Sequence, residues 1–221
     1  MTSKEILTWI TGVGIVPVVR ASSAEAAIHA VEALHDGGIT VAEITMTVPG
    51  AVKALEKLAD RFGGKVLMGA GTVLDPETAR ACMLAGAEFL VSPSLRLSVI
   101  EMARRYSKPI FPGALTPTEV LAAWEAGADA VKVFPCGNVG GAKYIKALKG
   151  PFPQIALVPT GGVNLETIGD FLKAGACAVG VGGELVDATL IRDGRFDALR
   201  DRALEFLTAV AKARAEIADR R

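Results

Sequence analysis

The sequence predicts an α/β protein: a single (β/α)8 (TIM) barrel over residues 1–221 with an extra helix before the first strand. Short β-branched runs alternate with amphipathic segments, which is typical of parallel βαβ units. In addition, Gly38, Gly86, Gly127 and Gly175 each follow a helical segment, at intervals of 48, 41 and 48 residues. Glycine there supplies the left-handed conformation that ends a helix. Each interval holds two βα units, and this fourfold repeat favours a closed barrel over a doubly wound open sheet.

The elements follow in a regular order. Eight apolar, β-branched runs are the predicted strands, at residues 14–20, 41–45, 65–71, 88–92, 109–113, 129–135, 155–162 and 177–183. Helical periodicity marks residues 24–34, 52–62, 76–84, 99–106 and 166–173. A helix at 4–11 should cover the amino-terminal mouth of the barrel, and a long helix at 196–218 should close the fold.

Composition narrows the classes of partner. Lys plus Arg equals Asp plus Glu at 24 each, so the chain lacks the basic field that binding to nucleic acid or an anionic membrane usually needs. Three cysteines without C-x-x-C spacing fit neither a disulfide framework nor a zinc site. The start lacks the apolar block of a secretory signal, and no apolar run approaches a membrane span. We therefore expect a cytoplasmic protein that binds a small molecule and uses no metal or cofactor.

Two charged residues fall on inward-facing positions of predicted strands. Alternation along residues 129–135 places Lys132 inside the barrel, and alternation along 41–45 does the same for Glu43. Burial favours the neutral amine, which can attack a ketone. A carboxylate in a partly dry site can transfer protons near neutral pH. The pair is therefore either a structural ion pair or a nucleophile with its acid–base partner, and both can hold.

Active sites of such barrels lie at the carboxyl ends of the strands. Arg20 ends the first strand and could bind a carboxylate in bidentate fashion, although a surface arginine is nearly as good an interpretation. Thr72 follows the glycines of the third strand, and its hydroxyl can donate to an anion. His29 and His35 both fall on the first barrel helix, so we expect surface residues there and no metal-assisted aldol chemistry.

Glycine pairs follow the last two strands. These pairs, Gly161–Gly162 and Gly182–Gly183, stand where this fold usually cradles a phosphate, although alone they could be tight turns. Glu184 comes directly after the second pair, and its carboxylate would repel a phosphate.

Taken together, these residues resemble the 2-dehydro-3-deoxy-phosphogluconate aldolase family, also called the 4-hydroxy-2-oxoglutarate aldolase family. The likeness runs from about Gly14 to Val186 through VVRA, EITMTVP, GAGTV, VSPS, PGALTPTE, VKVFP, GPFP and PTGGV. VKVFP together with EIT and PTGGV is specific, whereas GAGTV alone is not. The resemblance implies a class I, metal-independent lyase that releases pyruvate from a 2-keto-3-deoxy sugar acid, as a homotrimer.

The resemblance also assigns roles. Lys132 would form the imine with the substrate's C2 ketone, and Glu43 would move protons, through a water. The remaining expected roles are carboxylate binding by Thr72 and an arginine, a pocket wall from Thr47, Pro93 and Phe134, and phosphate binding by Thr160, Gly161, Gly162, Gly182 and Gly183.

Two positions depart from the family pattern. Thr47 stands where some members have the carboxylate-binding arginine, and Arg20 resembles the substitute used by others. Glu184 stands where a serine is frequent, which leaves room for an unphosphorylated acid such as 4-hydroxy-2-oxoglutarate.

Two other functions remain open. A phosphate-binding isomerase or epimerase would use Glu43 alone, with Lys132 only electrostatic. A catalytically silent binding protein or oligomeric shell would keep the fold and bind a keto acid without turnover.

Overall fold

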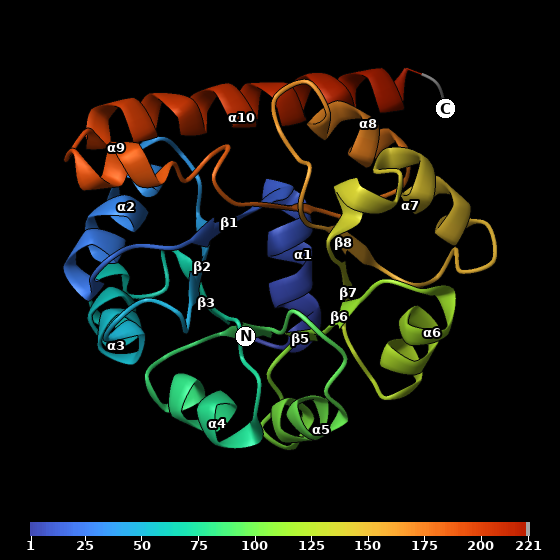
Figure 1. Ribbon diagram of the computed structural model, residues 1–221, viewed down its shortest axis with the longest axis horizontal. Coiled ribbons are helices and arrows are strands. Elements are labelled where there is room, and N and C mark those ends of the chain that lie inside the picture. The colour runs from blue at the N-terminus through green and yellow to red at the C-terminus, as the bar shows by residue number, and fades with distance from the viewer. Residues whose placement is uncertain (220–221) are drawn as a thin grey trace.

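A computed structural model describes residues 1–219 and confirms the α/β barrel, a ring of parallel strands surrounded by helices (Figure 1). The strands are β1 (Ile15–Val19), β2 (Val41–Thr45), β3 (Leu67–Gly71), β4 (Phe89–Val91), β5 (Ile110–Phe111), β6 (Gly113–Ala114), β7 (Val131–Val133), β8 (Leu157–Pro159) and β9 (Val179–Val181). The helices are α1 (Ser3–Val13), α2 (Ala24–Asp36), α3 (Ala51–Phe62), α4 (Pro76–Leu84), α5 (Leu97–Arg105), α6 (Pro117–Glu125), α7 (Ala142–Lys149), α8 (Ile168–Lys173), α9 (Ala188–Arg192) and α10 (Phe196–Ala218), with a short 3₁₀ turn at Cys136–Val139.

The ring of strands consists of two hydrogen-bonded sheets. Hydrogen-bonded neighbours run β5-β4-β3-β2-β1-β9 in one sheet and β6-β7-β8 in the other. A parallel bridge between Thr160 and Gly180 joins β8 to β9. The fifth predicted strand is split into β5 and β6 at Pro112, because proline has no N–H to donate to the ladder. The eight predicted strand positions therefore all form, one of them in two pieces.

Strand alternation divides the apolar residues into two cores. Outward residues such as Ala42 and Val131 pack under the helices in the larger cluster. Inward residues from the strand starts, among them Val41, Leu67 and Phe89, form a smaller cluster with Ile6 and Ile10 of α1. As the residues at 4–11 predict, α1 lies across the amino-terminal end of the barrel (Figure 1). Lys132 is therefore approached from the carboxyl ends of the strands.

The helix signals in the sequence largely hold. Gly38, Gly86, Gly127 and Gly175 all adopt positive φ, between 93° and 99°, as predicted for residues that end helices. Helix α6 forms before Gly127, as the glycine repeat predicts, and it begins at a capping box: Thr116 accepts from the Glu119 N–H and the Glu119 carboxylate accepts from the Thr116 N–H. Such reciprocal bonds satisfy amides that a helix start leaves unpaired.

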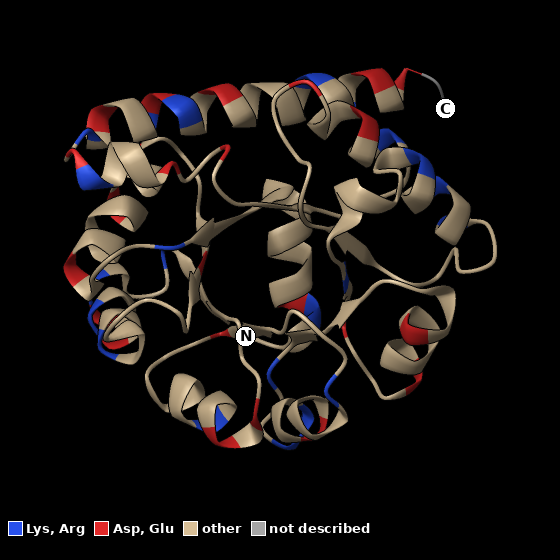
Figure 2. Cartoon of the chain, viewed as in Figure 1, with Lys and Arg blue, Asp and Glu red and all other residues tan. Residues whose placement is uncertain are grey.

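Charged residues of both signs are spread over the outer helices (Figure 2). Over residues 1–219, no helix is long and apolar enough to cross a membrane.

The last helix fixes the helix that covers the barrel end. Arg214 of α10 donates to the carbonyl oxygens of Thr11 and Gly12, the second at 2.5 Å. Both acceptors lie near the carboxyl end of α1, where carbonyls have no intrahelical partner and a cation is favourable. The bond to Gly12 thereby joins residues that are 202 positions apart in the sequence.

We expect Arg214→Ala to lower the free energy of unfolding by about 1–2 kcal/mol, because two hydrogen bonds from a charged donor are lost. Urea denaturation measures the change. Lys212→Ala, an exposed position on the same helix, is the matched control and should have a much smaller effect. Equal losses in the two variants would contradict the anchoring role.

Candidate functional site

Lys132 and Glu43 meet inside the barrel. The side chains are only 6% and 3% exposed, and Lys132 Nζ lies 3.9 Å from Glu43 Oε1. That separation suits an ion pair but exceeds a direct hydrogen bond. Over residues 1–219, Glu43 Oε1 has no hydrogen-bond partner. The ring of Phe134 lies 5.4 Å from Nζ and offers its face to the ammonium.

The glycine that ends β3 makes room for the carboxylate. A Cβ at Gly71 would lie 1.8 Å from Glu43 Oε1, a distance that no side chain allows. Gly71 pairs with Thr45 in the β2–β3 register, two residues beyond Glu43. The register of the two neighbouring strands therefore explains why this position is glycine.

Thr72 occupies a strained backbone conformation at the same end of β3. Its φ is +57°, which is a genuine outlier for a β-branched residue. Over residues 1–219, no internal hydrogen bond uses its hydroxyl. Strain of this kind clusters at functional sites, and here it stands directly after the glycine that contacts Glu43.

The glycine pairs form one cavity of about 200 Å³ at the carboxyl ends of β8, β9 and β1. Its walls are Val18, Arg20, Phe134, Thr160, Gly161, Gly162, Val163, Gly180, Gly182, Gly183 and Glu184. It adjoins the buried pair, because Val18 pairs with Glu43 in the β1–β2 register. Likewise Val158, two residues before Thr160, pairs with Lys132. The volume suits a small polar group rather than a large ligand.

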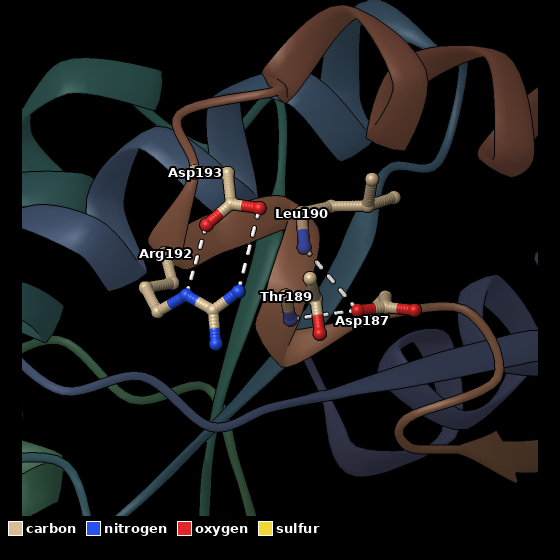
Figure 3. Close-up of polar contacts among 5 residues, drawn as sticks. All are labelled: Asp187, Thr189, Leu190, Arg192 and Asp193. Carbon is tan, nitrogen blue, oxygen red and sulfur yellow. Dashed lines mark hydrogen bonds and ion pairs between the residues drawn. The ribbon is translucent and has the colours of Figure 1, made fainter.

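The helix ends near this cavity are already capped by the protein itself. Asp187 Oδ1 accepts from the N–H groups of Thr189 and Leu190 at the start of α9 (Figure 3). These bonds lower the pKa of Asp187, so its carboxylate stays charged. Before α8, the Thr167 N–H donates to the side chain of Asn164. The loop amides, rather than the helix ends, are left for a ligand: over residues 1–219, no internal hydrogen bond uses the N–H of Gly162, Gly183 or Glu184.

The structure does not bring all predicted site residues together. Arg20 lines the cavity with the glycine pairs, whereas Thr72 directly follows Gly71, the glycine that meets Glu43, and is not part of the wall of that cavity. Thr47 is exposed, and its hydroxyl lies 2.7 Å from that of Thr45. Since Thr45 donates its proton to the Val19 carbonyl, the proton between the two threonines comes from Thr47.

Two further residues complete the mouth of the barrel. The half-buried Pro93 presses its backbone against Gly113 of β6, since a Cβ there would lie 2.2 Å from the Pro93 carbonyl. Cys136 follows β7 and was not singled out from the sequence as a site residue. Burial raises the pKa of its thiol to about 11, so the thiol is protonated at neutral pH and does not compete as a nucleophile.

His29 and His35 lie on α2, outside the ring, as predicted.

A closed parallel barrel with a buried lysine and carboxylate beneath its carboxyl-terminal mouth defines the class of (β/α)8-barrel enzymes that act at this end of the fold.

Comparison with known proteins identifies the family. The family model of KDPG and KHG aldolases matches residues 6–201. The chain is 36% identical over 183 residues to the 2-dehydro-3-deoxy-6-phosphogalactonate aldolase of Escherichia coli strain K12, covering 82% of this chain and 89% of that protein. It is 33% identical over 204 residues to the KHG/KDPG aldolase of the same strain, covering 92% and 94%.

A solved structure agrees. KDPG aldolase from Legionella pneumophila, with pyruvate captured as a covalent carbinolamine, superimposes with a TM-score of 0.84 at 31% identity, covering 90% of this chain and 96% of that one. The protein therefore belongs to the KDPG and KHG aldolase family, a class I Schiff-base family of lyases.

Thr72→Gly should raise the free energy of unfolding by about 1 kcal/mol, because glycine adopts this left-handed φ without strain. Urea denaturation provides the measurement. Thr72→Ser keeps a Cβ at the strained φ and should gain far less. A Thr72→Gly protein no more stable than Thr72→Ser would show that the conformation costs little.

Proposed function

We propose that this protein cleaves a 2-keto-3-deoxy sugar acid to pyruvate and an aldehyde through a Schiff base on Lys132. The observation that carries the proposal is the buried Lys132 amine, 3.9 Å from the Glu43 carboxylate. A lysine amine in its neutral form is the nucleophile for a ketone. The proposed substrates are 2-dehydro-3-deoxy-6-phosphogluconate and 4-hydroxy-2-oxoglutarate, or another unphosphorylated 2-keto acid.

The proposed reaction begins at the C2 ketone. The Lys132 amine adds to C2, water leaves, and the resulting protonated imine accepts the electron pair when the C3–C4 bond breaks. Glu43 takes the proton of the C4 hydroxyl, so the departing fragment leaves as an aldehyde. The enamine is then protonated at C3 with the help of Glu43, and hydrolysis returns the amine and releases pyruvate. The separation of 3.9 Å leaves space for a substrate hydroxyl or a water between the two groups.

In this proposal Thr72 binds the C1 carboxylate. Thr72 directly follows the glycine that contacts Glu43, and its hydroxyl has no hydrogen-bond partner among residues 1–219. Phe134 and Pro93 then form the apolar side of the pocket, and the loops carrying Gly162 and Gly183 receive the far end of the substrate.

Borohydride reduction in the presence of pyruvate tests the nucleophile. We expect a stable adduct on Lys132, located by peptide mass spectrometry, and no adduct in Lys132→Met. Lys143→Ala, an exposed lysine on α7, is the control and should be modified like the wild type. An active protein that pyruvate and borohydride leave unmodified would instead support the isomerase or epimerase.

Catalytic turnover should depend on Lys132 in the same way as pyruvate trapping does. Removing the nucleophile should lower kcat by orders of magnitude, measured by coupling pyruvate release to lactate dehydrogenase. Since a buried charge left unpaired is destabilising, circular dichroism must establish that Lys132→Met is folded. An adduct without any pyruvate release from either substrate class would indicate a catalytically silent binding protein.

We also propose a homotrimer. Support comes from an exposed apolar surface near the starts of α4 and α5, where Leu74 is 48% and Leu97 is 60% exposed. The two leucines lie at the starts of α4 and α5, which are neighbouring helices that pack against each other. Large exposed apolar side chains gathered on one face are typical of association surfaces.

Light scattering after size-exclusion chromatography should give about three times the 22.9 kDa chain mass. Leu97→Glu should lower that mass, because a carboxylate is costly to bury at an interface. Leu204→Glu, at a residue of α10 that is 50% exposed, is the control and should leave the mass unchanged. A wild-type protein with the mass of one chain would contradict the trimer.

A further inference from the structure

The mouth of the barrel has a polar side and an apolar side. Charged and hydroxyl-bearing residues stand at or just beyond the carboxyl ends of β1, β2 and β3. Across the ring, Pro93 follows β4, and the ring of Phe134, after β7, lies 5.4 Å from Lys132 Nζ (Figure 1). The strand between β4 and β7 is the split pair β5 and β6, and the residue that follows it is Leu115.

Leu115 stands beside Phe134 and faces the mouth. In the β6–β7 register Ala114 pairs with Val133, and the Phe134 N–H donates to the Ala114 carbonyl at 3.1 Å. The Ala114 side chain packs in the outer core. Because successive side chains point to opposite faces of a strand, the next residue points into the barrel. Leu115 is half-buried, and over residues 1–219 it packs against neither of the two apolar cores.

Both polar atoms of the Leu115 backbone are held by neighbouring helices. Its N–H donates to the Glu119 carboxylate of α6 at 2.8 Å, and its carbonyl accepts from the Tyr144 hydroxyl of α7. Backbone bonds from Leu115 and Thr116 lower the pKa of Glu119, so the carboxylate stays charged at neutral pH. A half-buried leucine on a backbone held at both ends forms a fixed part of the wall.

The proposed binding mode leaves one part of the substrate to face this wall. Lys132 on β7 bonds to C2, the C1 carboxylate lies at Thr72 after β3, and the far end lies in the loops after β8 and β9. The side of the mouth that remains is the apolar one, formed by Pro93, Leu115 and Phe134. The hydrogens on C3 of a 3-deoxy acid can pack there, whereas an added carbon on C3 would meet the wall.

We propose that Leu115 determines specificity at C3 of the substrate. It admits an unsubstituted C3, as in pyruvate, and excludes a 2-keto acid with a further carbon on C3. Tyr144 is a positioning residue, because it holds Leu115 through the backbone carbonyl. This inference rests on the proposed aldolase function, which fixes how the substrate lies. One methylene group in an apolar pocket changes specificity by roughly 10- to 200-fold.

Competition between pyruvate and 2-oxobutanoate, which has one more carbon on C3, tests the wall. Both acids can form the same imine: the Lys132 amine adds to C2, the C2 oxygen leaves as water, and borohydride transfers hydride to C2. With both acids at equal concentration, peptide mass spectrometry measures the ratio of the two adducts on Lys132. Wild type should favour pyruvate by about 10-fold or more, and Leu115→Ala should reduce this preference by roughly 5-fold or more.

The comparison between variants isolates the pocket, because the intrinsic reactivity of the two acids is the same in every reaction. Leu95→Ala is the matched control: Leu95 is also half-buried, in the loop after β4, but it packs against the outer core. It should keep the wild-type adduct ratio. Tyr144→Phe keeps the aromatic ring and removes the hydroxyl that holds Leu115, so it should shift the ratio in the same direction as Leu115→Ala, by a smaller factor.

An adduct ratio in Leu115→Ala equal to that of wild type would overturn the inference, and so would an equal change in Leu95→Ala. A lower mass of Leu115→Ala in light scattering would also overturn it, because Leu115 would then belong to a contact between subunits. Equal trapping of the two acids by wild type would refute this inference alone. A wild-type protein that traps neither acid would refute the aldolase proposal instead.

Discussion

The site depends on one buried interaction, the approach of the Lys132 ammonium to the Glu43 carboxylate inside the barrel. Taking either charge out of water costs several kcal/mol, and mutual attraction offsets that cost only when the geometry is good. The pair at 3.9 Å is not in direct hydrogen-bond contact, and Glu43 Oε1 has no other partner in the described residues. The arrangement is therefore less favourable for stability than a direct ion pair would be, and it keeps both groups available to a third.

The barrel makes this interaction possible because its interior is filled with apolar side chains at the amino-terminal end and is less filled toward the carboxyl-terminal end. At the amino end, Phe89, Leu67 and the α1 residues Ile6 and Ile10 fill the ring with apolar atoms. Toward the carboxyl ends of the strands, glycine stands in place of a larger side chain, and Gly71 leaves the space that the Glu43 carboxylate occupies. The packed amino-terminal layer excludes water from one side, and the less filled carboxyl-terminal layer admits a small molecule from the other.

Much of this follows from the sequence because it depends on local rules. Period-2 alternation is sufficient to turn Lys132 and Glu43 inward, and glycines at helix ends are sufficient to mark the βα repeat. Other features depend on what a neighbouring strand contributes. The split at Pro112 reflects the hydrogen-bond ladder, and the approach of the Arg20 guanidinium to Gly182 joins the ends of two different strands. The strained φ of Thr72 is likewise invisible in a pattern of residue types, because threonine rarely adopts it.

Depth along one strand changes what a charged residue can do. Two residues along a strand correspond to about 6.6 Å, so Arg20 lies one inward step beyond Val18, the register partner of Glu43. At the level of Glu43 a charge is desolvated and reactive, whereas at the exposed level of Arg20 it stays hydrated, costs little to maintain and can reorient toward a ligand. Substitutions at the outer level can therefore leave the buried pair undisturbed. Substitutions at the inner level, such as a side chain at Gly71, cannot be separated from the chemistry, since the Glu43 carboxylate already fills that space.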